Sequence, residues 1–158
     1  MGILLAGDWS RLENSIHRMA RLDFTAMHRD IGEHLVSSTK DRFETGTAPD
    51  GSRWPESIRA QNEGGQTLRD TSNLYNSITY HARPDLVEVG TNSRIAPVHQ
   101  EGKIIKVKQA RHLHFKVGGR WARKKKVKIP ARPFIGISDE DRQAIDDIIA
   151  EHLEECLE

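Results

Sequence analysis

Residues 78–89 read Ile78-Thr79-Tyr80-His81-Ala82-Arg83-Pro84-Asp85-Leu86-Val87-Glu88-Val89. Apolar and polar side chains alternate over residues 78–82, which is the pattern of a strand with one buried face. The Pro84-Asp85 pair marks a turn, and residues 86–89 suit a returning strand. The stretch therefore predicts an antiparallel β-hairpin that is closed by residues 90–92.

A second hairpin, which we call the basic hairpin, is predicted at residues 103–128. Apolar and polar residues alternate over residues 112–117, Gly118-Gly119 suits a two-residue turn, and Trp121 lies on the return arm. The stretch contains eleven Lys or Arg residues and no acid. These cations are Lys103, Lys106, Lys108, Arg111, Lys116, Arg120, Arg123, Lys124, Lys125, Lys126 and Lys128.

Helices are predicted on both sides of the hairpins. Residues 9–22 and 23–44 carry apolar side chains at helical spacing, which leaves open whether they form two helices or one bent helix. Gly46 suits the left-handed C-cap position after them. Residues 138–157 give the clearest helix, because Ser138 with Asp141 approximates a capping box. The apolar stripe of this helix comprises Ile145, Ile148, Ile149, Leu153 and Cys156.

Shorter elements are predicted between these landmarks. They are a loop at residues 46–67, a short helix at 68–77 capped by Asp70 or Thr71, one helical turn at 96–101 stopped by Gly102, and a last strand at 134–137.

The order of helices, then short strands with turn signals, then a helix indicates an α+β fold. We expect N-terminal helices, a small, mainly antiparallel sheet with long hairpins, and a C-terminal amphipathic helix. A chain of 158 residues is the usual size of one domain. We therefore expect a single domain over residues 1–158, with N-terminal helices at 9–45, the loop at 46–67, a β-rich middle at 68–137 and the C-terminal helix at 138–157.

The charge of the chain is balanced in total and divided along its length. The formal net charge is +1, yet residues 138–158 contain nine acids and one base, opposite in sign to the basic hairpin. Such blocks indicate partners more than they indicate a fold. Cys156 is the sole cysteine, so no intrachain disulfide is expected. No apolar run long enough for a membrane helix and no secretion signal is apparent, so we expect no membrane partner and a cytoplasmic site of synthesis.

No residue pattern predicts an enzyme, and we expect no catalytic residue, cofactor or metal. His112 and His114 could share a metal on one strand face, but no nearby Cys or acid supplies the other ligands. The chain has no glycine-rich phosphate loop. Cys156 lies on an apolar stripe near a helix C-terminus, where the helix dipole opposes thiolate formation. The helix dipole and solubility also explain the acids at the start of the last helix.

The basic hairpin has three alternative interpretations. Its cations could follow a phosphate backbone, with His114, Phe115 and Trp121 interleaved for base stacking. They could instead contact an acidic protein surface, such as the acidic C-terminal helix of a neighbouring copy. The third alternative is a solvated hairpin with no partner. The charges alone favour a protein partner.

Several short blocks follow one another at characteristic spacing. They are Pro49-Asp50-Gly51-x-x-Trp54-Pro55, Leu68-Arg69-Asp70-Thr71-Ser72-Asn73-Leu74, Val89-Gly90-Thr91-Asn92, Ala96-Pro97-Val98-His99-Gln100-Glu101-Gly102 and Ile129-Pro130-Ala131-Arg132-Pro133-Phe134-Ile135-Gly136-Ile137-Ser138. In this order they resemble the phage virion morphogenesis family, which includes tail-completion proteins of contractile-tailed phages and the G protein of Mu-like phages. Ser72 replaces a glycine of the family pattern, and the His99 block lacks the family's tyrosine. The resemblance covers residues 30–155.

The resemblance implies a structural protein that acts late in virion assembly, in tail completion or head–tail joining at the virion neck. It implies a ring-forming subunit, expected as a hexamer, that contacts itself and other phage tail or neck proteins and belongs to the virion. A nucleic-acid-binding module that uses the basic hairpin to contact DNA is the alternative.

Interface candidates come from the matched blocks and from the basic hairpin. Trp54 suits either a core position or an anchor for a neighbour. His99 and Gln100 could satisfy backbone groups at a helix end or could meet a partner. The remaining candidates are Lys103, Lys106, Lys108, Arg111, Lys116, Trp121, Arg123, Lys124, Lys125, Lys126 and Lys128.

Overall fold

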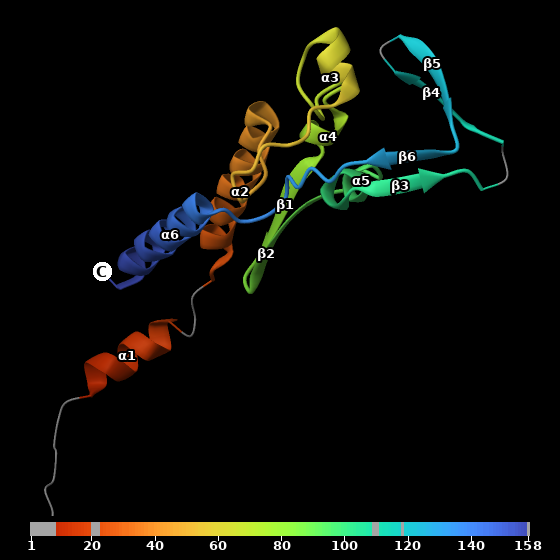
Figure 1. The fold of residues 1–158 in the computed structure, drawn as a ribbon. Coiled ribbons are helices and arrows are strands. Elements are labelled where there is room, and N and C mark those ends of the chain that lie inside the picture. Colours follow the sequence, from red (N-terminus) through yellow and green to blue (C-terminus); the bar gives the residue numbers. More distant parts are fainter. Residues whose placement is uncertain (1–8, 20–22, 109–110, 118, 158) are drawn as a thin grey trace, which may run out of the picture.

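The computed structural model describes residues 9–19, 23–108, 111–117 and 119–157 of the chain. The elements follow the predicted order of helices, strands and a final helix, so the α+β class is confirmed (Figure 1). They are α1 (Ser10–Met19), α2 (Thr25–Thr45), α3 (Ile58–Glu63), α4 (Asn73–Asn76), β1 (Ile78–Arg83), β2 (Leu86–Thr91), α5 (Ala96–Glu101), β3 (Lys103–Lys106), β4 (Leu113–Val117), β5 (Arg120–Lys124), β6 (Lys126–Ile129) and α6 (Asp139–Leu157).

The described strands form three separate two-stranded ladders rather than one sheet. All three are antiparallel: β1 pairs with β2, β3 with β6, and β4 with β5. The register from Ile78 opposite Thr91 to Arg83 opposite Leu86 confirms the two-residue turn at Pro84-Asp85. The basic hairpin is also confirmed, since β3 and β6 form its base and β4 and β5 its outer part. Its predicted turn includes Gly118, which lies outside the described residues.

The core lies where α2 packs against the β1–β2 hairpin and the segment that leads into α6. Phe43 of α2 is at its centre, with ring centroids 5.6 Å from Trp54, 5.9 Å from Tyr75 and 5.2 Å from Phe134. Ala48, Leu74, Ile78 and Ala96 complete the buried cluster. Helix α2 also crosses β1 so closely that a methyl group at Gly32 would overlap the ring of Tyr80. The core therefore joins elements that are far apart in the sequence.

Helix α2 ends and helix α6 begins as the sequence predicts. The backbone N–H of Gly46, which adopts a left-handed conformation at φ 69°, donates to the carbonyl of Arg42. At the start of α6, the Asp141 N–H donates to Ser138 Oγ at 3.1 Å, and the Ser138 N–H donates to Asp141 Oδ2 at 2.8 Å. This reciprocal pair is a capping box.

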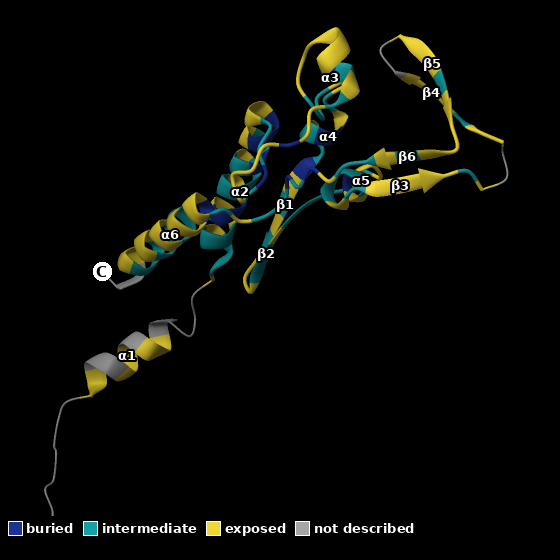
Figure 2. Cartoon of the chain, viewed as in Figure 1, coloured by how far each residue is buried: buried dark blue, intermediate teal, exposed yellow. Residues whose placement is uncertain are grey.

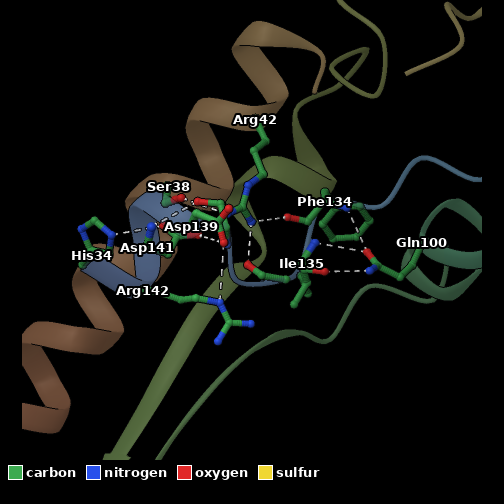
Figure 3. A network of polar contacts seen from close by, with 11 residues as sticks. His34, Ser38, Arg42, Gln100, Phe134, Ile135, Asp139, Asp141 and Arg142 are labelled. Atoms are coloured by element: carbon green, nitrogen blue, oxygen red, sulfur yellow. Dashed lines mark hydrogen bonds and ion pairs between the residues drawn. The ribbon is translucent and has the colours of Figure 1, made fainter. Parts of the chain in front are cut away.

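A polar network joins α2 to α6 beneath these caps (Figure 3). The Arg42 guanidinium forms an ion pair with the buried Asp141 carboxylate. It also donates to the carbonyls of Phe134 and Gly136 at 3.0 and 2.8 Å. His34 lies 3.1 Å from the other Asp141 oxygen. The network therefore fixes the last helix and the preceding segment on α2.

Three predicted elements differ from the structure. The expected loop at 46–67 contains α3, because the Ser57 side chain accepts from Ala60 N–H and caps a helical turn. The expected helix at 68–77 shrinks to α4, because Leu68 and Ser72 adopt positive φ values that a helix does not allow. Residues 134–137 form no strand, because side chains of Gln100 and Arg42 bond their backbone groups instead of a neighbouring strand.

Candidate functional site

The basic hairpin extends away from the core as an arm (Figure 1). At its base, Lys103 lies opposite Ile129 and Lys106 opposite Lys126. In the outer ladder, Lys116 lies opposite Trp121. Between the two ladders the Val107 N–H donates to the Lys125 carbonyl at 3.1 Å. The arm is thus one interrupted hairpin, and among the described residues each of its strands pairs only with another strand of the arm.

Most of the described residues of the arm are exposed (Figure 2). Every cation of the basic hairpin is exposed, and the Trp121 side chain is 76% exposed. Ile104 and Ile105 on the base are exposed as well. Across the described residues, no ion pair involves a cation of the arm. The arm therefore presents uncompensated positive charge next to exposed apolar groups.

The arm is expected to have little stability of its own. An isolated two-stranded hairpin is marginally stable in water. Here Lys106 and Lys126 are directly opposite, and like charges at such positions destabilise a ladder. An acidic surface beside the arm would remove this repulsion and cover the apolar groups. The arm therefore combines marginal intrinsic stability with unpaired positive charge.

Helix α6 carries the complementary charge. Its inner side packs on α2, where His152 Nε2 lies 2.7 Å from an Asp30 carboxylate oxygen. Except for the buried Asp141, the acids of α6 are exposed: Asp139, Glu140, Asp146, Asp147, Glu151, Glu154 and Glu155. Arg142 offsets only Asp139, at 3.9 Å. The outer side of α6 is therefore an acidic face on the body of the molecule.

The candidates from the matched blocks lie outside the arm, where those blocks meet. Trp54 is 7% exposed, and its Nε1–H donates to the Pro133 carbonyl at 2.8 Å, which fits the core alternative. Gln100 Oε1 accepts from the N–H groups of Phe134 and Ile135 at 3.0 and 3.2 Å. Gln100 Nε2 donates to the Ile135 carbonyl at 2.8 Å. Gln100 thus satisfies backbone groups, as one of its two interpretations expects.

His99 differs from its neighbour Gln100. Its backbone carbonyl accepts from the Arg132 N–H at 2.6 Å, but its buried Nδ1 has no hydrogen-bond partner in the described residues. Burial, and then the charge of Arg132, lower the pKa of His99 below its ordinary value. Gly102 follows with φ 73°, and a Cβ there would lie 2.6 Å from the Ala131 nitrogen. Both contacts hold α5 tightly against the segment that contains Arg132.

His112 and His114 do not lie together on one strand. His112 precedes β4 rather than lying within it, and His114 is exposed. Within the described ranges, no three His, Cys, Asp or Glu side chains are arranged to hold a metal ion. No helix in the described part of the chain has the length and apolar character that a membrane span needs.

Known proteins give the geometry its context. The model of the phage virion morphogenesis family matches residues 8–154. The chain belongs to the phage virion morphogenesis family. It is 32% identical over 117 residues to the Mu-like prophage FluMu G protein 2 of Haemophilus influenzae, covering 74% of this chain and 69% of that protein. No solved structure matches the chain. The resemblance seen in the short blocks is thereby confirmed.

Membership assigns the protein a role in phage virion morphogenesis. This family is associated with structure and assembly rather than with catalysis. The blocks that carry the resemblance contact one another inside the molecule, through the hydrogen bonds of Trp54, His99 and Gln100. Sequence reasoning missed Arg42, Asp141 and Arg132 as key buried polar residues. The Ser138–Asp141 capping spacing was the available signal for Asp141. The sequence contains no comparable signal for its ion-pair partner Arg42, because an Arg at this helical position could equally be a solvated cation.

Proposed function

We propose that this protein is a non-enzymatic tail-completion or head–tail joining subunit that forms a ring, expected to be hexameric, at the virion neck. In this proposal it contacts other copies of itself and other tail or neck proteins. Its place in the family supports an assembly role. The observation that carries the finer proposal is the exposed basic arm, which has no acidic partner among the described residues of its own chain.

The arm of one copy binds the acidic face of α6 in the next copy. The two surfaces are different, so the contact is heterologous, and repetition around an axis closes a ring. Opposite charge steers such surfaces together and fixes their register. The apolar Ile104, Ile105 and Trp121 side chains then lose solvent at the interface, where a buried aromatic anchor contributes strongly to affinity.

A charge-swap series tests the contact by sedimentation of the purified protein. Reversing the arm with Lys124→Glu, Lys125→Glu and Lys126→Glu is expected to leave a folded monomer. Reversing α6 with Asp146→Lys, Asp147→Lys and Glu151→Lys is expected to do the same. The variant that carries both reversals regains complementary surfaces and is expected to oligomerise again. Arg83→Glu, which changes a cation outside the arm, serves as the matched control.

Failure of the doubly reversed variant to oligomerise, while both single sets are folded monomers, would contradict the arm-to-helix contact. Location in the particle is tested separately by immunogold labelling of purified phage. Label at the head–tail junction is expected. Absence of label, with the protein recovered in the cell lysate, would exclude a permanent neck component.

DNA binding is the second candidate, because Trp121 is exposed among the cations of the arm. A DNA-binding arm would show binding that falls steeply with salt, since each neutralised phosphate releases a counterion. The protein candidate is favoured because a neck channel that passes a genome should not grip it. Salt-sensitive DNA binding by the wild-type ring, lost in the arm reversal, would reverse this preference.

A further inference from the structure

A cavity beside α5 contains a buried cation, Arg132, which belongs neither to the arm nor to the acidic face. Its volume is about 280 Å³, and its lining includes His99, Arg132, Thr71 and Asn73. Arg59 and Asp70 lie on the same lining and pair with each other at 3.6 Å. The cavity therefore combines polar groups from three of the matched sequence blocks.

Arg132 is the unusual member of this lining. The residue is only 5% exposed, and its Nε donates to the Pro55 carbonyl at 2.7 Å. No carboxylate of the described residues forms an ion pair with it. Burial lowers its pKa below the ordinary value, and no acidic neighbour counteracts this effect. A buried charge without a counter-ion is costly, so proteins ordinarily pair it.

His99 also lines this cavity. Its Nδ1 is buried without a hydrogen-bond partner in the described residues. An orphaned buried polar atom of this kind costs free energy. The lowered pKa favours the neutral imidazole near pH 7, so His99 adds no second positive charge to the lining. The lining thus offers one net cation and neutral hydrogen-bonding groups.

We propose that the Arg132–His99 cavity binds a carboxylate group presented by an adjacent protein subunit. One carboxylate neutralises the one uncompensated guanidinium, and its two oxygens match the planar fork of the Arg side chain. A phosphate near pH 7 would bring an excess negative charge close to Asp70. The identity of the donor as a neighbouring subunit rests on the proposed assembly function, whereas binding of a free carboxylate does not.

Acetate is the probe for the cavity, and thermal unfolding of the purified full chain is the first readout. Acetate at ten times its Kd is expected to raise the Tm by about 3–6 °C over sodium chloride of equal ionic strength. The increase is expected to saturate and to be absent in Arg132→Met. Arg83→Met, which removes an exposed cation, is expected to retain it. The arm reversal is also expected to retain it, which separates failure of the cavity from failure of the arm contact.

Nuclear magnetic resonance of the His99 ring in the wild-type protein keeps the test valid if Arg132→Met does not fold. Acetate is expected to shift the His99 ring signals and to leave those of His152 unchanged. The proposal is overturned if neither the Tm nor the His99 ring signals respond saturably to acetate. Inorganic phosphate that binds more tightly than acetate also overturns it and points to a nucleic acid.

Assembly tests the source of the carboxylate. If the Arg132→Met monomer is folded, the Kd of its oligomerisation is expected to be at least about tenfold higher than that of the wild type. This is the effect of losing a central interface residue. Unchanged oligomerisation, with acetate binding abolished, would show that the cavity takes a small free carboxylate and would overturn the assignment to a neighbouring subunit.

Discussion

Arg42 of α2 and Asp141 of α6 are 99 positions apart in the sequence and form an ion pair that is buried from solvent. The same Arg42 guanidinium holds the carbonyls of Phe134 and Gly136 (Figure 3). The same carboxylate caps the first turn of α6. One pair of side chains therefore positions both the acidic helix and the segment that carries Arg132.

Removal of the Arg42 charge is expected to destabilise the fold strongly. Arg42→Met keeps much of the apolar stem but leaves the Asp141 carboxylate buried and unpaired, at a cost of about 3–5 kcal/mol. Urea unfolding followed by circular dichroism measures the change. Arg142→Met, at the exposed pair with Asp139, is the control and should change stability by no more than about 0.5 kcal/mol. Equal effects of the two variants would contradict the structural role of the buried pair.

The stability of the protein is expected to decrease in acid because of Asp141. Burial alone would raise the pKa of this carboxyl, but hydrogen bonds from Ser138 and Ser38 and the charge of Arg42 together lower it below 3.8. The folded state therefore binds this proton less readily than the unfolded state does. The stabilisation is fully present above the unfolded pKa and is lost as pH falls through the lower folded pKa.

Urea unfolding of the wild-type protein and of Asp141→Asn at a series of pH values measures this contribution. The difference in stability between them is expected to be constant at neutral pH and to diminish below about pH 4. A difference that stays constant throughout the acid range would show that Asp141 does not titrate differently on folding.

Gly102 is expected to tolerate no side chain. Gly102→Ala places a methyl group at φ 73° and 2.6 Å from the Ala131 nitrogen, so both backbone strain and overlap oppose folding. Gly119→Ala provides the control, because φ is 75° there and nothing lies within 4 Å of the added group. Strain alone costs about 1–2 kcal/mol, and Gly102→Ala should exceed its control. Thermal unfolding of both variants gives the comparison, and equal losses would show that the contact of α5 with Ala131 relaxes freely.

Trp121 is expected to matter for assembly and not for folding of the single chain. The side chain is 76% exposed, so Trp121→Ala should change the stability of the monomer by no more than about 0.5 kcal/mol. Oligomerisation should weaken by about tenfold or more if the indole is an interface anchor. Sedimentation at several concentrations measures it. Unaltered association would place Trp121 outside the interface.

The comparison of sequence and structure is most instructive at residues 129–138. The prolines predict an extended segment, and the structure has no helix over residues 130–134. The Ser138–Asp141 spacing correctly predicts the start of α6. The predicted strand at 134–137 is wrong, because a run of apolar residues does not show where its backbone bonds go. Gln100 supplies those bonds from a position 34 residues earlier, and sequence periodicity carries no signal for a contact of that kind.

The sequence by itself determined the hairpins, the charge division and the helix ends, because alternation, turn residues and caps act between residues a few positions apart. The tertiary structure alone decided that Trp54 is a core residue, that Gln100 supports the backbone, and that Arg132 is buried without a counter-ion. The physical reason is that burial and hydrogen-bond satisfaction depend on which distant segments meet. An Arg or Lys side chain needs no counter-ion on a solvated arm, whereas burial of the same charge in a cavity is costly without one.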